Sequence, residues 1–275
     1  MFVKSIDPEQ LEQMELAVFP GKIVVIDSLG PAFDKAIRYL RSQKVIGFDT
    51  ETRPCFSPSQ PHYGVALLQL SGPEKAYLFR INKIGMQKRL ANILASDQIL
   101  KIGAAVKDDI RGLQKYMPFE EAGFVDLQKI VWEWGIKDKS VKKMSAIILG
   151  FRVSKTQQLS NWEAEQLSDA QQKYAATDAW VCREMYFQLQ KSEKHPLTAE
   201  EMLPPMPPEQ KAKMLAKAEA RRAHEEMVEA SRKRKAARRE AARKRELEAQ
   251  ARKRQRKAAR QAAHAARQTE AKKAK

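Results

Sequence analysis

The sequence has little cysteine and lacks the cysteine and glycine patterns that mark several common kinds of site. Its two cysteines, Cys55 and Cys182, form no C-x-x-C pair and no cluster with the four histidines among the 275 residues. This excludes a disulfide framework, a zinc finger and an iron-sulfur site, and it favours a reducing compartment. The phosphate-binding patterns G-x-G-x-x-G and G-x-x-x-x-G-K-[ST] are also absent, so no motif supports nucleoside-triphosphate chemistry.

Long hydrophobic runs are missing too. No apolar run approaches the ~18 residues that a membrane-spanning helix needs. The start, MFVKSIDPEQLEQ, lacks the basic and apolar regions of a secretion signal. We therefore expect no membrane segment and a cytoplasmic protein, or a nuclear one if the source is eukaryotic.

The segment from Glu209 to Lys275 has no aromatic residue, proline or glycine, so it cannot bury a core. It holds 24 Lys and Arg against nine Asp and Glu, which is +15 of the chain's net charge of +17, and 20 of its residues are alanine. We expect a basic tail, helical or disordered, that binds the nucleic-acid phosphate backbone without sequence specificity. A solubilising extension with no partner is the alternative interpretation.

Before this tail, short β-branched runs alternate with amphipathic stretches, which is typical of an α/β domain with a mixed sheet. The sequence divides into an N-terminal extension (1–22), a folded domain (23–192), a proline-rich linker (193–208) and the tail (209–275). We expect strands at 22–27, 45–52, 64–72 and 75–81, the last three as a meander, and an apolar strand in KIGAAV that runs into a helix at Asp108 and Asp109. Helices are expected at 31–41, 86–95, 108–116, 127–134 and 140–149, and after a capping box of Ser168 and Gln171.

Three short segments carry acidic residues in patterns that favour chemistry. Asp49 and Glu51 lie two apart on an expected strand, so both carboxylates project from one face and repel each other unless a cation or proton intervenes. Asp108 and Asp109 lie where a strand runs into a helix. Tyr174 and Asp178 are four apart in the last helix and share one of its faces. Each pattern alone is common in strands, caps and helices, and only the combination is informative.

The combination resembles a known family. The segments GFDTET, GAAVKDDIRGLQ and SNWEAEQLSDAQQKYAATDAWVCREMY resemble the three motifs of the 3′-5′ exonucleases of the DEDD superfamily, tyrosine subtype. The resemblance covers about Ile23 to Leu189 and is closest to ribonuclease D-like and Werner-type exonuclease domains. It implies a ribonuclease H-like fold, a mixed β-sheet flanked by helices. The histidine subtype fits less well, because its histidine position reads Ala175 here.

The resemblance also implies a mechanism. Two divalent ions, Mg²⁺ or Mn²⁺, would be held by four acids, and a tyrosine would orient the attacking water. Nucleoside monophosphates would be released from the 3′ ends of nucleic acid. Carried over by motif, the acids are Asp49, Glu51, Asp109 and Asp178, and the tyrosine is Tyr174.

Several alternatives stay open at this stage. Asp108 could replace Asp109 as the second-motif acid, the substrate could be DNA or RNA, and the fold could be an inactive nucleic-acid-binding platform or a ribonuclease that processes structured RNA ends. Lys143 and Lys155 could meet backbone phosphates. Other candidates favour structural roles: we expect Trp162 and Cys182 in the core and His62 in a loop.

Overall fold

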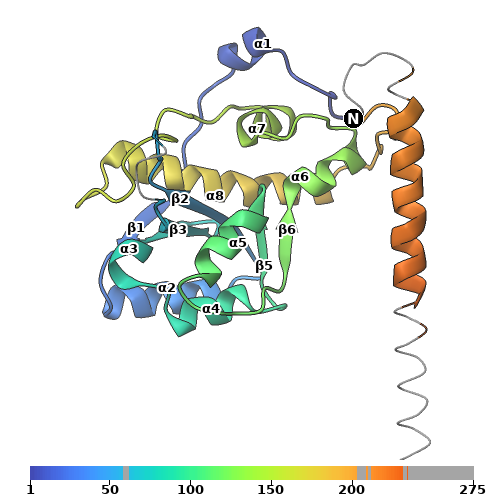
Figure 1. Cartoon of the computed structure of the whole chain (residues 1–275). Helices are drawn as coiled ribbons and strands as arrows, with labels where there is room; N and C mark the ends of the chain where they lie inside the picture. Colours follow the sequence, from blue (N-terminus) through green and yellow to red (C-terminus); the bar gives the residue numbers. More distant parts are fainter. Residues whose placement is uncertain (58–61, 203–208, 210–211, 232–233, 235–275) are drawn as a thin grey trace, which may run out of the picture. The chain divides into compact units, whose positions relative to one another are not determined.

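A computed structural model describes residues 1–57, 62–202, 209, 212–231 and 234 (Figure 1). The chain divides into two compact units, Met1–Met202 and Leu203–Lys275. In the second unit residues 212–231 are helical and mostly exposed. Linker residues 203–208 lie outside the described residues, as do most of the Lys and Arg residues of the tail. In the described part of the chain, every helix is too short or too polar to cross a membrane.

Within the described residues the first unit is built on a mixed sheet in the order β1-β4-β3-β2-β5-β6. Strands β2, β3 and β4 form the expected antiparallel meander, while β1 runs parallel to β4, β5 parallel to β2, and β6 parallel to β5. The strands are β1 (Lys22–Ile26), β2 (Val45–Thr52), β3 (Val65–Ser71), β4 (Lys75–Phe79), β5 (Leu100–Gly103) and β6 (Phe124–Asp126).

The helices follow the expected order with some corrections. Helix α5 begins two residues earlier than expected, and the single helix expected at 127–134 is a short α-helix followed by a 3₁₀ turn. Three short elements, α1, α3 and β6, carried too little periodic pattern to be expected. The helices are α1 (Pro8–Gln13), α2 (Pro31–Arg41), α3 (Ile81–Ile84), α4 (Lys88–Leu94), α5 (Val106–Gln114), α6 (Leu127–Ile130), η1 (Val131–Trp134), α7 (Val141–Leu149) and α8 (Asp169–Gln190).

Helices cover both faces of the sheet. Apolar residues of α2, α4 and α5 pack in one cluster with alternate residues of the strands, and α8 packs across the opposite face (Figure 1). Because β3 lies in the middle of the sheet, every residue of it is buried, including Gln69 and Ser71. The capping box of Ser168 and Gln171 is present and begins α8 as expected.

The N-terminal residues pack against this unit. Helix α1 and the residues around it contact α7 through Ile6 and Leu11. Farther on, the backbone N–H of Phe19 donates to the Thr177 hydroxyl on α8 (2.9 Å). Lys4, near the start of the unit, forms an ion pair with Glu201, near its end.

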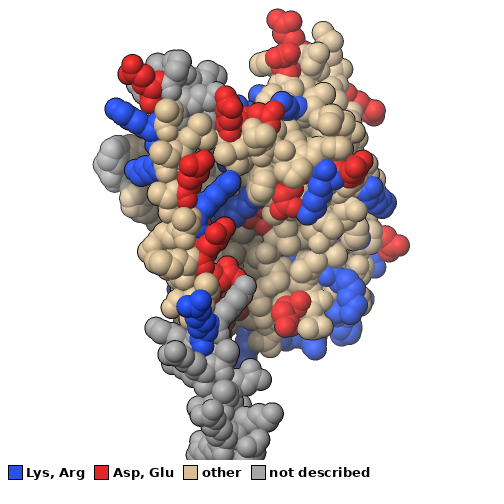
Figure 2. Space-filling view, turned by 90° about the vertical axis from the view of Figure 1, so that its right-hand side faces the viewer, with Lys and Arg blue, Asp and Glu red and all other residues tan. Residues whose placement is uncertain are grey.

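The charges of the first unit nearly balance. Residues 1–208 hold 27 Lys and Arg against 25 Asp and Glu. Figure 2 shows basic and acidic side chains interspersed over the described residues on the face it presents. The chain's excess of positive charge therefore belongs to the tail.

Helix α8 touches strand β2 without an intervening side chain. A Cβ atom added at Gly47 would lie only 1.8 Å from the carbonyl oxygen of Ala179. The buried side of α8 is rich in alanine at this point, with Ala175, Ala176 and Ala179. The helix can therefore lie close to the strand, and the acidic residues just beyond Gly47 come beside those of α8.

We predict that Gly47→Ala lowers the free energy of unfolding by about 1–3 kcal/mol, because the added methyl group must push strand and helix apart. Gly30→Ala is the matched control, since a Cβ there meets no atom within 4 Å. Denaturant unfolding of both variants measures the difference. Equal stability of Gly47→Ala and the wild type would contradict the close approach.

Candidate active site

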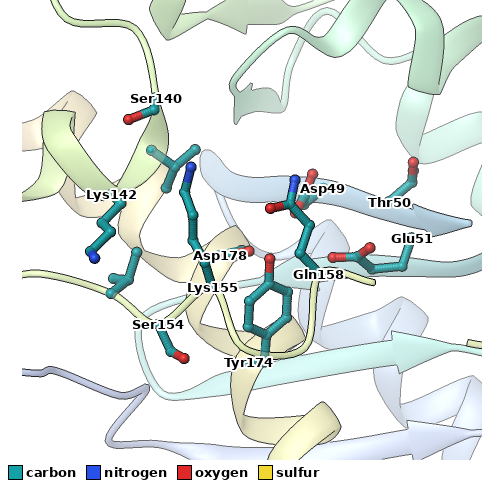
Figure 3. A pocket seen from close by; sticks show the side chains of 12 residues that line it. Asp49, Thr50, Glu51, Ser140, Lys142, Ser154, Lys155, Gln158, Tyr174 and Asp178 are labelled. Atoms are coloured by element: carbon teal, nitrogen blue, oxygen red, sulfur yellow. The ribbon is translucent and has the colours of Figure 1, made fainter. Parts of the chain in front are cut away.

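A pocket of about 320 Å³ opens where β2, α8, the start of α7 and the loop before α8 meet (Figure 3). Its lining combines carboxylates with hydroxyl, amide and amino groups. The lining residues are Asp49, Thr50, Glu51, Ser140, Val141, Lys142, Val153, Ser154, Lys155, Gln158, Tyr174 and Asp178.

Three carboxylates from two distant segments converge in this pocket. Asp49 and Glu51 project from the same face of β2, as their spacing predicted, and Asp178 reaches the same point from α8 (Figure 3). One carboxylate oxygen of each residue lies within 4.8 Å of those of the other two. The fold thus concentrates negative charge at one place.

The surroundings of these acids favour their protonated forms when no cation is bound. Burial raises the pKa of Asp49 well above its usual range, and the nearby Asp178 and Asp109 raise it further. Burial, reinforced by the charge of Asp49, raises the pKa of Glu51 to about 10. Burial also raises the pKa of Asp178 to about 7, although Tyr174 and Lys155 partly oppose the shift. Within the described residues no Lys or Arg forms an ion pair with any of the three.

Tyr174 lies one helical turn before Asp178, and its hydroxyl points toward the carboxylates (Figure 3). Burial raises the pKa of this phenol, and the negative charges of Asp178 and Glu51 raise it further, so the hydroxyl keeps its proton. Behind the ring lies Trp162, fully buried, with the two ring centroids 5.9 Å apart. Trp162 is therefore a core residue, as expected, and it supports Tyr174 from behind.

Asp109 lies close to this group but outside it. The Thr50 hydroxyl donates to Oδ1 of Asp109 at 2.5 Å, which connects α5 to β2 between the two acids of the strand. Burial raises the pKa of Asp109 to about 6. Its neighbour Asp108 has a side chain that is 91% exposed and faces Arg111. Of the two residues left open by the sequence, only Asp109 is directed toward the site.

The side of the pocket opposite the acids is polar. Lys155 is exposed there, on the same side as Ser140 and Ser154, and Gln158 also lines the pocket (Figure 3). No sequence pattern predicted that Ser140, Ser154 and Gln158 line the pocket, because they lie in loops and at a helix start, outside any acidic motif. Lys143 does not line the pocket and instead contacts Asp138 at 3.1 Å.

The other two candidates are structural. His62 is exposed in a loop, and Cys182 is buried in the core, both as expected.

The donor set fits a hard divalent cation. Three carboxylates supply only oxygen ligands, the kind that Mg²⁺ and Mn²⁺ prefer. Burial raises the pKa values of all three acids, and a divalent cation would favour their charged forms by displacing their protons.

The chain is similar to known 3′-5′ exonucleases. A family model described as 3′-5′ exonuclease matches residues 31–193, which is more than half of the chain. DNA polymerase I of Aquifex aeolicus is 30% identical over 152 residues, and exonuclease 3′-5′ domain-containing protein 2 of Drosophila melanogaster is 33% identical over 150 residues. These matches cover 55% and 53% of this chain and 25% of each relative, so the chain spans about a quarter of the length of these curated relatives.

A solved structure, the EXO domain of Nibbler from Aedes aegypti, shares the fold with a TM-score of 0.54 and 24% identity. The likeness covers 64% of this chain and 91% of that one. This likeness shows the fold, and the family-model match shows the family. The chain belongs to the 3′-5′ exonuclease domain family.

Proposed function

We propose that this protein is a metal-dependent 3′-5′ exonuclease that releases nucleoside monophosphates from the 3′ ends of nucleic acid. The observation that carries the proposal is the convergence of Asp49, Glu51 and Asp178 within 4.8 Å, in a pocket that also holds the Tyr174 hydroxyl. Asp109 would complete the set from the adjacent α5. Family membership supports the reaction type.

Each side chain has a definite part in this reaction. Asp49, Glu51, Asp109 and Asp178 would hold two Mg²⁺ or Mn²⁺ ions, which when bound supply a nucleophilic water and neutralise charge on the phosphate and on the leaving oxygen. The protonated Tyr174 hydroxyl would donate a hydrogen bond that orients the attacking water. Lys155, across the pocket, is placed to contact a phosphate oxygen.

The partner we propose is a DNA or RNA strand with a free 3′ end. The pocket of about 320 Å³ would receive the terminal nucleotide, while the balanced charge of residues 1–208 offers little general attraction for a long polyanion. We propose that the tail supplies this attraction and tethers the substrate.

Wild-type protein with Mn²⁺ or Mg²⁺ should shorten 5′-labelled linear single strands of DNA or RNA from their 3′ ends, and a chelator should stop the reaction. Circular strands should survive, because they offer no 3′ end. Asp178→Asn should abolish cleavage, and Tyr174→Phe should lower kcat by about 100-fold, the lower end for loss of a positioned proton donor or acceptor. Tyr186→Phe, on the same helix but outside the pocket, is the control. Cleavage of circles at the linear rate would exclude an exonuclease.

The raised pKa values predict how stability depends on pH. In the folded protein the pKa is about 7 for Asp178 and about 10 for Glu51. In the unfolded chain the pKa of a carboxyl group is about 4. Between these values the metal-free folded protein binds more protons than the unfolded chain, so its stability falls as pH rises from about 5 to about 8. Mn²⁺ should replace the missing protons, and its increase of Tm should grow over the same range.

Thermal melts in chelator and in Mn²⁺ across this pH range make the measurement. Asp178→Asn should flatten the metal-free pH dependence and reduce the Mn²⁺ effect. A Tm increase from Mn²⁺ that is the same at about pH 5 and about pH 8 would count against carboxylate ligands.

Ending the chain at Pro208 should separate tethering from catalysis. The truncation removes +15, so affinity for long single strands should fall sharply at low salt. The slope of log affinity against log salt should lose about 0.7 for each phosphate contact removed. Turnover of short saturating substrates should not change, because all five proposed site residues precede the tail. Equal salt slopes for the two proteins would show that the tail is no tether.

A further inference from the structure

The link between β5 and α5 contains an unfavourable backbone conformation. Ala105 has φ of 59°, the one positive φ at a non-glycine residue in the described part of the chain. For an alanine this left-handed conformation costs about 1–2 kcal/mol. Its side chain is exposed, so local packing does not explain the conformation. Another group must hold the backbone in place.

That group is the carboxylate of Asp126. Its Oδ1 atom accepts hydrogen bonds from the backbone N–H of Ala105 (2.9 Å) and from that of Gln128 (3.1 Å). Asp126 is 8% exposed and ends β6, directly across from Gly103 at the end of β5. One buried oxygen thus ties the start of α5 to the end of the neighbouring strand.

The direction in which α5 leaves the sheet follows from this tie. The helix begins at Val106, immediately after Ala105, and Asp109 lies in its first turn. The junction has little room to move: a Cβ at Gly103 would lie 2.6 Å from Val106 Cγ1 and 2.8 Å from the carbonyl oxygen of Phe48. A change of backbone at Ala105 would therefore move Asp109 relative to Thr50 and Asp49.

We propose that Asp126 is a positioning residue: by holding Ala105 in the left-handed conformation it fixes α5 so that Asp109 faces the metal-binding acids. The inference rests on the proposed function for its catalytic consequence. Asp126 itself lies outside the group formed by Asp49, Glu51 and Asp178, and it acts through the backbone of the junction.

The test uses full-length variants that separate the hydrogen-bond acceptor from the charge. Asp126→Ala removes the acceptor, whereas Asp126→Asn keeps an oxygen that can accept from the same two N–H groups. Ala105→Gly in the Asp126→Ala background makes the left-handed conformation inexpensive without an acceptor. Asp138→Ala is the matched control, because Asp138 is also a partly buried acid that accepts from a backbone N–H, that of Ile6 at 3.0 Å.

Two readouts are needed. Hydrogen exchange of metal-free protein over residues 104–109 reports the junction directly, and the Mn²⁺ concentration for half of the maximal Tm increase reports the metal site. For Asp126→Ala we expect faster exchange, a Mn²⁺ requirement raised about tenfold or more and a lower kcat at unchanged KM. Asp126→Asn and the double variant should return toward wild type, and Asp138→Ala should change neither readout.

Should Asp126→Ala fold poorly, Ala105→Val tests the same junction. This substitution leaves Asp126 intact, and the side chain at position 105 is exposed, so the larger residue has room. A β-branched residue strongly disfavours positive φ. The substitution should reproduce the raised Mn²⁺ requirement.

Three results would overturn the inference. The first is unchanged hydrogen exchange over residues 104–109 in Asp126→Ala. The others are a Mn²⁺ requirement raised as much in Asp126→Asn as in Asp126→Ala, and a Mn²⁺ requirement that Ala105→Gly does not lower in the Asp126→Ala background. Failure of the proposed function looks different. Wild-type protein would then neither gain stability from Mn²⁺ nor shorten 3′ ends, while the exchange results would still decide whether Asp126 holds the junction.

Discussion

The direct contact between α8 and β2 is the constraint on which the site depends. Acidic residues repel, and no attraction among Asp49, Glu51 and Asp178 would bring them together. They are brought together because apolar side chains along α8 pack against the sheet on both sides of this point, with Gly47 of β2 directly against Ala179. The hydrophobic contact along the rest of α8 offsets the repulsion at one point of it.

This arrangement leaves the metal-free site strained in an electrostatic sense. Burial raises the pKa values of all four acids, and repulsion by neighbouring site acids raises those of Asp49 and Glu51 further. Burial and the charges of Asp178 and Glu51 also raise the pKa of Tyr174. Such a cluster contributes poorly to stability by itself and is the kind of local conflict that folds keep at functional sites. Lys142 and Lys155 line the pocket, but neither forms an ion pair with these acids, so a bound cation would supply the charge that offsets them.

Much of the fold and of the site could be predicted from the sequence because the signals are local. The two-residue spacing of Asp49 and Glu51 predicts a shared strand face, and the capping box at Ser168 predicts where α8 begins. The meander follows from three consecutive strand patterns. These predictions need no knowledge of distant residues.

Other features depend on contacts between distant segments. The choice between Asp108 and Asp109 required the helix start at Val106, two residues before the acidic pair, and that start depends on Asp126 in a three-residue strand with no periodic signal. Ser140, Ser154 and Gln158 reach the pocket only because their loops fold over it. The N-terminal residues showed no pattern that predicts their contacts with α7 and α8.

The ion pair between Lys4 and Glu201 has a consequence for architecture. It brings the two ends of the first compact unit together, although almost two hundred residues separate them in sequence. A unit whose ends meet can be placed within a loop of another protein, or joined to further domains at either end, without stretching its host. The same geometry would tolerate new termini elsewhere, as in a circular permutant. The geometry of this exonuclease unit is therefore compatible with insertion into another protein or fusion to further domains.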